Sequence, residues 1–103
     1  MNTNNEIQII KSEEDLRNVI WNNPSDVKIV KVGASWCSPC QKIAPGYVKL
    51  SDKCKSVEFY TMDVSDRNNS KAWDAFRNMG GEKIPYFTIY KNYEKIAAIQ
   101  TSD

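Results

Sequence analysis

The sequence predicts an α/β domain with a mixed β-sheet, formed by residues 1–103 as a single unit. Apolar, β-prone runs alternate with segments in which apolar residues recur at helical spacing. The last two β-prone runs are separated only by a short polar turn, which predicts a hairpin. A chain of 103 residues is long enough for one hydrophobic core. The expected order of elements is therefore β-α-β-α-β-α-β-β.

The N-terminal part predicts a short strand followed by a helix. Residues 6–10 are β-prone. Ser12 is a favourable N-cap, and the acidic residues at positions 13–15 face the positive end of the helix dipole. Apolar residues on one face continue to Trp21, and the polar run around Pro24 ends the helix.

The run Val27–Gly33 predicts a central strand, because it leads directly into a pair of cysteines. Buried parallel strands are usually continuous apolar runs, and two lysines interrupt this one. Lys28 lies near the start of the strand and is expected to reach solvent. Lys31 alternates with valines and shares a face with Ile29 and Gly33, so its place in the fold needs another explanation.

A second helix is expected from about residue 37 to about residue 54. Pro39 suits its first turn, where no amide partner is lost. Helical spacing places Cys54 on the buried stripe of this helix. The preferred interpretation of Cys54 is a small apolar filler, and a regulatory thiol is the alternative.

The C-terminal half predicts three strands and one helix. Residues 57–64 form the next strand, and residues 69–79 form a helix whose apolar face is interpreted as core. Gly80-Gly81 ends that helix. Residues 84–90 and 95–100 are the two strands of the hairpin.

Composition excludes several classes of function. The formal net charge is +1, which gives no support for binding to nucleic acid or to an anionic membrane. No apolar run is long enough to span a bilayer. The N-terminus lacks the basic and apolar regions of a signal peptide, so we expect a cytoplasmic protein.

The chain has three cysteines and no histidine, which narrows the chemistry. An odd number argues against a framework of structural disulfides. Without histidine, Cys–His catalysis and the commonest zinc ligand sets are excluded. Cys37 and Cys40 supply two metal ligands and Cys54 a third without an obvious fourth, so no metal or other cofactor is expected. One helical turn apart, Cys37 and Cys40 can meet as a disulfide or separate as a dithiol.

The chain resembles the thioredoxin family over nearly its whole length. A Cys-x-x-Cys alone is moderate evidence, but here it is joined to a tryptophan, a helix proline and a distant Ile-Pro before a strand. The resemblance implies a thioredoxin fold and thiol–disulfide exchange with protein substrates. The residues that carry it are Trp36-Cys37-Ser38-Pro39-Cys40, Ile43-Ala44-Pro45, Met62-Asp63, Ile84-Pro85 and Lys91-Asn92.

The resemblance also implies roles for matched positions. Cys37 would be the exposed nucleophile and Cys40 the shielded resolving cysteine of a redox disulfide. Only a thiolate attacks, and a helix N-terminus lowers the pKa of the thiol beside it. Exchange would run through a mixed disulfide that Cys40 breaks. Substrate would bind at Trp36, Ser38, Pro39, Ile84 and Pro85, with Pro85 in cis and the Ile84 backbone pairing with the substrate chain.

Lys31 departs from the family, which usually carries a buried aspartate at this position to manage the proton of the second cysteine. Three interpretations stay open. A charged amine would stabilise thiolates and favour the dithiol, which would make the pair a stronger oxidant. A neutral amine could accept the Cys40 proton. Alternatively, the stem packs while the amine reaches solvent.

Other departures indicate a changed docking surface. Ser38 replaces a usual glycine, the segment between Asp63 and Pro85 is long, and Tyr86 stands where threonine is common. The chain ends soon after Ala98, so the family's last helix is missing and one sheet face would be partly bare. We expect a homodimer, another covering partner or a truncated chain.

The leading prediction is a protein disulfide oxidoreductase that a reductase or another thiol system recycles. The alternative is a binding protein of the same fold whose partner interaction does not depend on the thiols. The missing helix, the altered charge and the changed groove favour this alternative. A third hypothesis is a metal bridged between subunits by Cys37 and Cys40.

Overall fold

The computed structural model describes residues 7–100, which form five strands and three helices. In chain order the elements are β1 (Gln8–Ile9), α1 (Glu13–Trp21), β2 (Val27–Gly33), α2 (Ser38–Lys53), β3 (Val57–Asp63), α3 (Ser70–Asn78), β4 (Tyr86–Lys91) and β5 (Glu94–Gln100). The predicted order of strands and helices is confirmed.

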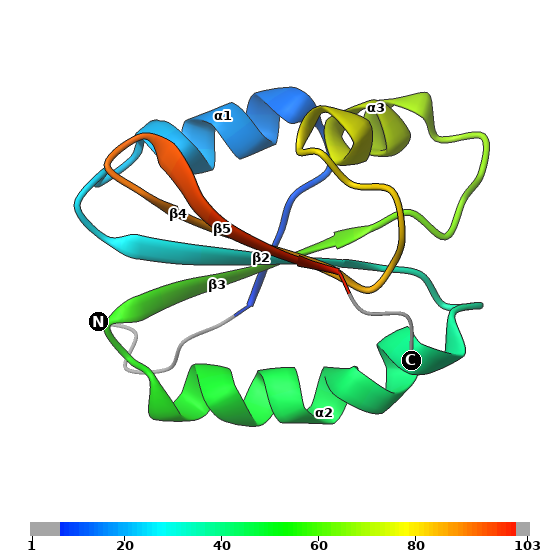
Figure 1. The fold of residues 1–103 in the computed structure, drawn as a ribbon, viewed down its shortest axis with the longest axis horizontal. Coiled ribbons are helices and arrows are strands. Elements are labelled where there is room, and N and C mark those ends of the chain that lie inside the picture. The colour runs from blue at the N-terminus through cyan, green and yellow to red at the C-terminus, as the bar shows by residue number, and fades with distance from the viewer. Residues whose placement is uncertain (1–6, 101–103) are drawn as a thin grey trace.

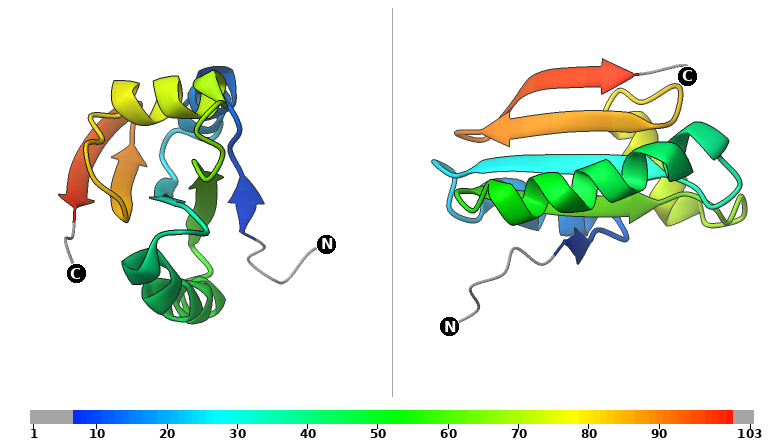
Figure 2. Two further views of the ribbon diagram at one scale, coloured as in Figure 1. Left: turned by 90° about the vertical axis from the view of Figure 1, so that its right-hand side faces the viewer. Right: turned by 90° about the horizontal axis from the view of Figure 1, so that it is seen from below.

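All five strands join one mixed sheet in the order β1-β3-β2-β4-β5, with β2 in the middle as predicted. The β1–β3 and β2–β3 pairs are parallel, and the β2–β4 and β4–β5 pairs are antiparallel. Figures 1 and 2 show three layers, with α1 and α3 on one face of the sheet and α2 on the other. The sheet therefore separates the two helical layers.

Each helix begins at a side chain that caps a backbone amide. Ser12 Oγ accepts a hydrogen bond from the N–H of Asp15 at 3.1 Å at the start of α1. Asn69 Oδ1 accepts from the N–H of Ala72 at 3.3 Å at the start of α3. These caps satisfy amides that have no partner within the helix, and they explain why the predicted helix starts are confirmed.

The strands differ from the prediction mainly at their ends. β1 covers two of the predicted residues, and residue 6 lies outside the described part of the chain. β4 starts at Tyr86 rather than at residue 84. The reason is that Pro85 has no N–H to donate to the ladder, so regular pairing begins after it.

The prediction that Lys28 reaches solvent is wrong. The side chain is buried, with 1% of its surface exposed. Its Nζ donates a hydrogen bond to the backbone carbonyl of Asn23 at 2.8 Å. β2 is paired on both edges, and the turn before it supplies a carbonyl acceptor for the buried amine.

The two faces of β2 have different surroundings. Val30 and Val32 are fully buried members of the main core cluster. Ile29, Lys31 and Gly33 alternate with them and are half-buried. Contacts with Tyr47 and Cys40 of α2 show that this second face lies under α2. Lys31 thus faces the helix that carries the cysteines.

Candidate functional site

Cys37 and Cys40 form a disulfide at the start of α2, with 5.3 Å between their Cα atoms. This separation is ordinary for a disulfide. Cys37 is the N-cap residue of α2, and its Sγ accepts a hydrogen bond from the N–H of Cys40 at 3.3 Å. The same sulfur would keep a backbone donor and the positive end of the helix when reduced, which favours its thiolate.

The expected exposure of Cys37 is corrected by the structure. In this oxidised state Cys37 is 7% exposed and Cys40 is 3% exposed, so both are buried. The Sγ of Cys37 is turned toward Cys40 by the disulfide and by the amide it caps, which withdraws it from the surface. Cys40 is the more shielded of the two, as the resemblance implied.

Trp36 is held beside the disulfide by the turn that follows β3. Its indole Nε1 donates to the carbonyl of Ser65 at 2.8 Å, and the N–H of Ser35 donates to Ser65 Oγ at 2.7 Å. The guanidinium carbon of Arg67 lies 4.2 Å from the centroid of the Trp36 ring. Sequence reasoning missed Ser65 and Arg67, because only the fold brings this polar turn to the cysteine segment.

Pro85 is placed at the same end of the sheet as the disulfide. The Ile84–Pro85 peptide bond is cis, as predicted, and Pro85 is buried. Val32 is paired with Tyr86 across the antiparallel β2–β4 ladder, so Pro85 lies level with the end of β2. The cysteine segment continues from that end of β2. Residues far apart in sequence, Pro85 and Cys37, are thereby brought to one region.

An open cavity of about 330 Å³ lies next to the disulfide on the α2 side of the sheet. Lys31 and Cys40 both line it, as do the polar residues Thr61 and Asp63. Gly33 packs closely against Cys40, because a Cβ at position 33 would lie 3.3 Å from both the Cβ and the Sγ of Cys40. The structure therefore brings Lys31 and Cys40 to one cavity.

The amine of Lys31 is partly withdrawn from water. Its Nζ lies 5.2 Å from the centroid of the Tyr47 ring, a cation–π geometry. Burial lowers the pKa of Lys31 from its ordinary value of 10.5, because desolvation disfavours the charged form. Among residues 7–100 no carboxylate lies within ion-pair distance of this amine. The cation therefore faces the cavity without an acidic partner from the described chain.

Tyr47 joins α2 to the neighbouring strands β2 and β3. Its hydroxyl is placed to donate to the backbone carbonyl of Tyr60 at 2.6 Å, and it also lies 3.2 Å from the carbonyl of Ile29. Burial raises the pKa of Tyr47, because the phenolate would be desolvated. Helical spacing is consistent with Tyr47 on the buried side of α2, but no sequence pattern indicates this polar role.

The long segment before Pro85 is tied to the end of β5. Gly80 has a φ of +91°, a left-handed conformation that favours glycine, and the α3 helix ends there as predicted. The N–H groups of Glu82 and Lys83 both donate to Gln100 Oε1, at 2.9 and 2.7 Å. A side chain from the last strand thus fixes the loop beside the candidate substrate surface.

The second helix ends at Cys54, which is half-buried and whose N–H donates to the carbonyl of Leu50 at 2.9 Å.

Within residues 7–100 no group of three or more His, Cys, Asp or Glu side chains is arranged to hold a metal ion. The helices in this part of the chain also include none with the length and apolar character needed to cross a membrane.

A mixed sheet that carries a Cys-x-x-Cys disulfide at a helix start, level with a cis-proline, defines a thioredoxin-fold redox site. The sequence profile of the Thioredoxin family matches residues 7–103. Thioredoxin H4-2 of Oryza sativa is 34% identical over 93 residues, covering 87% of this chain and 66% of its own. Thioredoxin of Geodia cydonium is 28% identical over 86 residues, covering 84% and 76%.

Solved structures agree with these sequence relatives. The crystal structure of Malassezia sympodialis thioredoxin superposes with a TM-score of 0.80 at 27% identity, covering all of this chain and 85% of that one. The chain belongs to the thioredoxin family. It is a thiol–disulfide oxidoreductase with a Cys37–Cys40 pair at its centre.

Proposed function

We propose that Cys37 is the attacking cysteine and Cys40 the resolving cysteine in exchange with protein disulfides. The observation that carries this assignment is the position of Cys37 as the N-cap of α2, where its Sγ receives the N–H of Cys40. An anionic sulfur at this point is stabilised by the helix end, and Cys40, deeper in the fold, lies within bonding distance of it.

The exchange proceeds in two substitutions at sulfur. The Cys37 thiolate attacks one sulfur of the substrate disulfide, forms a mixed disulfide and releases the other substrate sulfur as a thiolate that water protonates. Cys40 then loses its proton and attacks the Cys37 sulfur. The Cys37–Cys40 disulfide forms and the second substrate thiol leaves. Two electrons pass from the protein to the substrate, and the reverse sequence oxidises a substrate dithiol.

The proposed substrate-binding surface surrounds the disulfide. Trp36 supplies an exposed aromatic face, with 47% of its surface accessible, and Ser38 and Pro39 form the first turn of α2 beside it. Ile84 and Pro85 approach from the start of β4. The backbone of Ile84 would pair with an extended substrate chain, as strand addition at a sheet edge does in other complexes.

Lys31 is proposed to tune the cysteine pair from the cavity that it shares with Cys40. In its charged form the amine favours thiolates over the disulfide and so makes the pair more oxidising. Its lowered pKa also brings the neutral form, which can accept the Cys40 proton, closer to working pH. The charged form predominates below the pKa of the amine and the neutral form above it, so the two roles belong to different pH ranges.

Thioredoxins act on disulfide-containing substrates and are recycled by reductases, and this chain shares that chemistry. We propose a cytoplasmic location, where a reductase or another thiol system returns the Cys37–Cys40 pair to the dithiol. Neither a metal nor an organic cofactor is needed for the two substitutions at sulfur.

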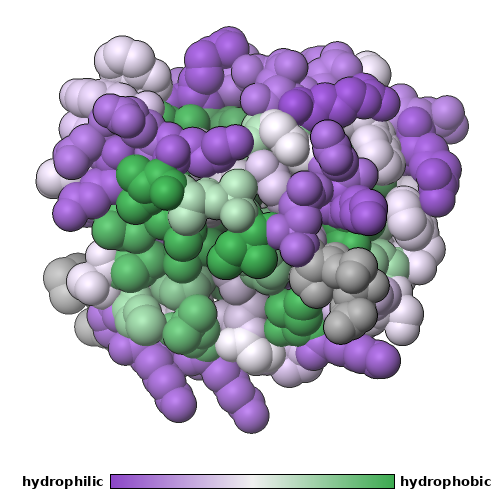
Figure 3. All heavy atoms as spheres, viewed as in Figure 1, coloured by the Kyte–Doolittle hydropathy of each residue, from purple (hydrophilic) through white to green (hydrophobic). Residues whose placement is uncertain are grey.

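The outer face of β5 is proposed to bind a second copy of this chain or another protein. β5 is the edge strand, and Ile96 and Ile99 on it are 58% and 54% exposed. Ile99 is paired with Phe87, which contacts Tyr47 on the α2 side of the sheet. Figure 3 shows apolar side chains gathered across the middle of this face. Such a patch on an edge strand is typical of an interaction surface.

The exchange mechanism is tested with the cysteine variants Cys37→Ser and Cys40→Ser. Wild type is expected to accelerate the reduction of insulin disulfides by dithiothreitol, and both variants are expected to lose this acceleration. Reduced Cys40→Ser should also trap a mixed disulfide with the substrate on a non-reducing gel, because the resolving thiol is absent. Wild type that gives no more acceleration than a sample without the protein would instead favour a binding protein whose partner interaction does not use the thiols.

A further inference from the structure

The Trp36 side chain beside the disulfide carries a cation on its ring. The guanidinium of Arg67 lies 4.2 Å from the ring centroid, and the indole N–H is fixed to the carbonyl of Ser65. Two attachments therefore hold the ring in one orientation. Arg67 itself is exposed. A substrate that approaches Cys37 across Trp36 meets this guanidinium.

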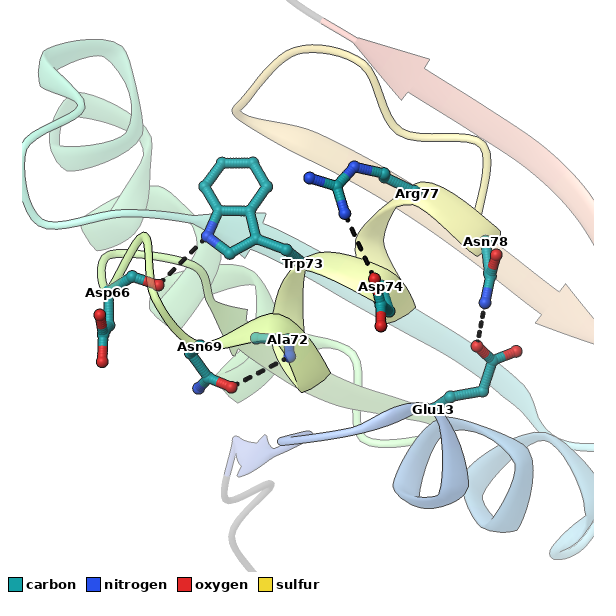
Figure 4. Close-up of polar contacts among 8 residues, drawn as sticks. All are labelled: Glu13, Asp66, Asn69, Ala72, Trp73, Asp74, Arg77 and Asn78. Carbon is teal, nitrogen blue, oxygen red and sulfur yellow. Dashed lines mark hydrogen bonds and ion pairs between the residues drawn. The ribbon is translucent and has the colours of Figure 1, made fainter.

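Arg67 also lines a concave surface that extends away from the disulfide along α3. This pocket of about 310 Å³ is lined by Arg67, Asn68, Ser70, Trp73 and Arg77. Figure 4 shows the Trp73 ring and the Arg77 guanidinium on the same side of α3. Their separation, 5.8 Å from guanidinium carbon to ring centroid, repeats the Arg–Trp arrangement seen at Trp36.

The acidic groups nearby leave Arg67 open to a new partner. Asp66 Oδ1 accepts from the N–H of Asn68 at 2.9 Å, and Asp63 Oδ1 accepts from the N–H of Ser65 at 2.8 Å. Among residues 7–100 no carboxylate is within ion-pair distance of Arg67. Arg77 pairs with Asp74 at 3.3 Å, in an exposed contact of the kind that contributes little.

We propose that the Arg67–Arg77 pocket is a docking subsite for an acidic side chain that the substrate protein carries near its disulfide. The proposal rests on the exchange function of Cys37 and Cys40 and names a substrate class for it. Two guanidiniums, a serine hydroxyl and an asparagine amide offer donors to one carboxylate, and guanidinium forks match carboxylate geometry. The two indoles hold both guanidiniums over flat surfaces.

Arg67 is the residue that connects this subsite to the chemistry. It contacts Trp36, the neighbour of Cys37 in sequence, and it lines the pocket that reaches Arg77. A carboxylate bound between the two arginines would place the rest of the substrate chain across Trp36. The subsite therefore determines which protein disulfides are preferred as substrates and does not take part in the exchange at sulfur.

The test uses peptides that contain one intramolecular disulfide and differ only in charge. In each acidic peptide a single Glu occupies one of the positions flanking the cysteines, and its control has Gln there. Fully reduced protein is mixed with each peptide, and acid-quenched samples are analysed for the peptide dithiol by mass spectrometry. Each turnover converts the Cys37–Cys40 dithiol to the disulfide and transfers two electrons and two protons to the peptide.

At low salt, wild type is expected to reduce at least one Glu peptide about two- to fivefold faster than its Gln control, the preference typical of a partly solvated ion pair. Arg67→Gln should bring that ratio to about one, and Arg77→Gln should lower it. Lys71→Gln is the matched control, because Lys71 is an exposed cation on the same helix and is absent from the pocket lining. Its ratio should stay at the wild-type value.

Three results would overturn the subsite. The first is that wild type reduces Glu and Gln peptides at equal rates for every Glu position. The second is that both arginine variants still reduce the Glu peptide faster. The third is that Lys71→Gln loses as much of this preference as the arginine variants do, which would indicate a general charge effect. A different result, in which no peptide of either charge is reduced by wild type, would remove the exchange function itself and the subsite with it.

Discussion

Lys31 brings an amine with no carboxylate partner among residues 7–100 to the cavity beside Cys40, where the partly desolvated cation lies over the Tyr47 ring. A charged amine there stabilises thiolates, so replacing it should favour the disulfide. We expect Lys31→Met to lower the reduction potential of the cysteine pair by on the order of 20 mV, because a half-solvated charge shifts the equilibrium by roughly 1 kcal/mol. Equilibration against glutathione measures this potential.

Lys49→Met provides the matched control, since Lys49 is an exposed lysine of α2 away from the cavity lining. Its potential should equal that of wild type. If Lys31→Met changes neither the potential nor the pKa of Cys37, Lys31 has no electrostatic role in the exchange.

Lys31 also predicts a pH dependence of stability. Its folded-state pKa lies below 10.5, whereas the unfolded chain titrates near 10.5. Between these two values the unfolded state binds more protons, so this residue makes stability rise with pH in that window. The free energy of unfolding of wild type, measured relative to Lys31→Met in the oxidised state by urea denaturation, should therefore increase from neutral pH toward pH 10.5. A flat difference would contradict the desolvation of the amine.

At the scale of elements, two glycines should respond in opposite ways to replacement by alanine, one variant losing stability and the other gaining it. Gly81 follows α3, and a Cβ on it would overlap the Phe76 ring in the core. Gly46 lies inside α2 with open space around it. We expect Gly81→Ala to destabilise the fold by about 1–3 kcal/mol through overpacking. Gly46→Ala should stabilise it by about 0.5–1 kcal/mol through helix propensity.

Urea denaturation of both glycine variants in the oxidised form gives the two free energies directly. Each variant is the control for the other, since the chemical change is the same and only the surroundings of the glycine differ. A loss of stability in Gly46→Ala similar to that in Gly81→Ala would show that α2 around Pro45 is packed more tightly than the structure has it.

At the scale of the whole molecule, the exposed edge strand predicts association. The proposed partner surface is centred on Ile96 and Ile99 of β5. If a second copy covers it, sedimentation of wild type should show a concentration-dependent dimer, and Ile99→Lys should abolish it, because a charge at an apolar interface is costly. Val48→Lys, on the exposed surface of α2, is the control. Wild type that stays monomeric at high concentration would exclude the homodimer.

Much of the fold could be predicted because its signals are local. Ser12, the acidic first turn and the run to Trp21 specify α1 through neighbours in sequence, and the structure has that helix as expected. The apolar run Val27–Gly33 likewise gave β2 with its limits. The prediction for Lys28 was wrong although its acceptor is near in sequence. The charge of a lysine suggests exposure, but the turn folds back so that the Asn23 carbonyl accepts the buried amine.

The redox chemistry of this protein can be inferred from its amino-acid sequence. Cys37 and Cys40, three residues apart at a helix start, can form one disulfide, and their spacing is a covalent fact that folding does not change. The family resemblance added Pro85 in cis, which the structure has. The disulfide follows from local spacing and residue type, whereas the cis state of Pro85 was implied by the family resemblance.

The surroundings of the two cysteines depend on the tertiary fold. It brought Lys31 to the Cys40 cavity, stacked Arg67 on Trp36, and fixed the loop before Pro85 to Gln100. Each contact joins segments that are separated in the chain, so neither periodicity nor motif could reveal it. The physical reason is that charge, desolvation and substrate access depend on distances in space, which the sheet order and the packing of α2 and α3 set.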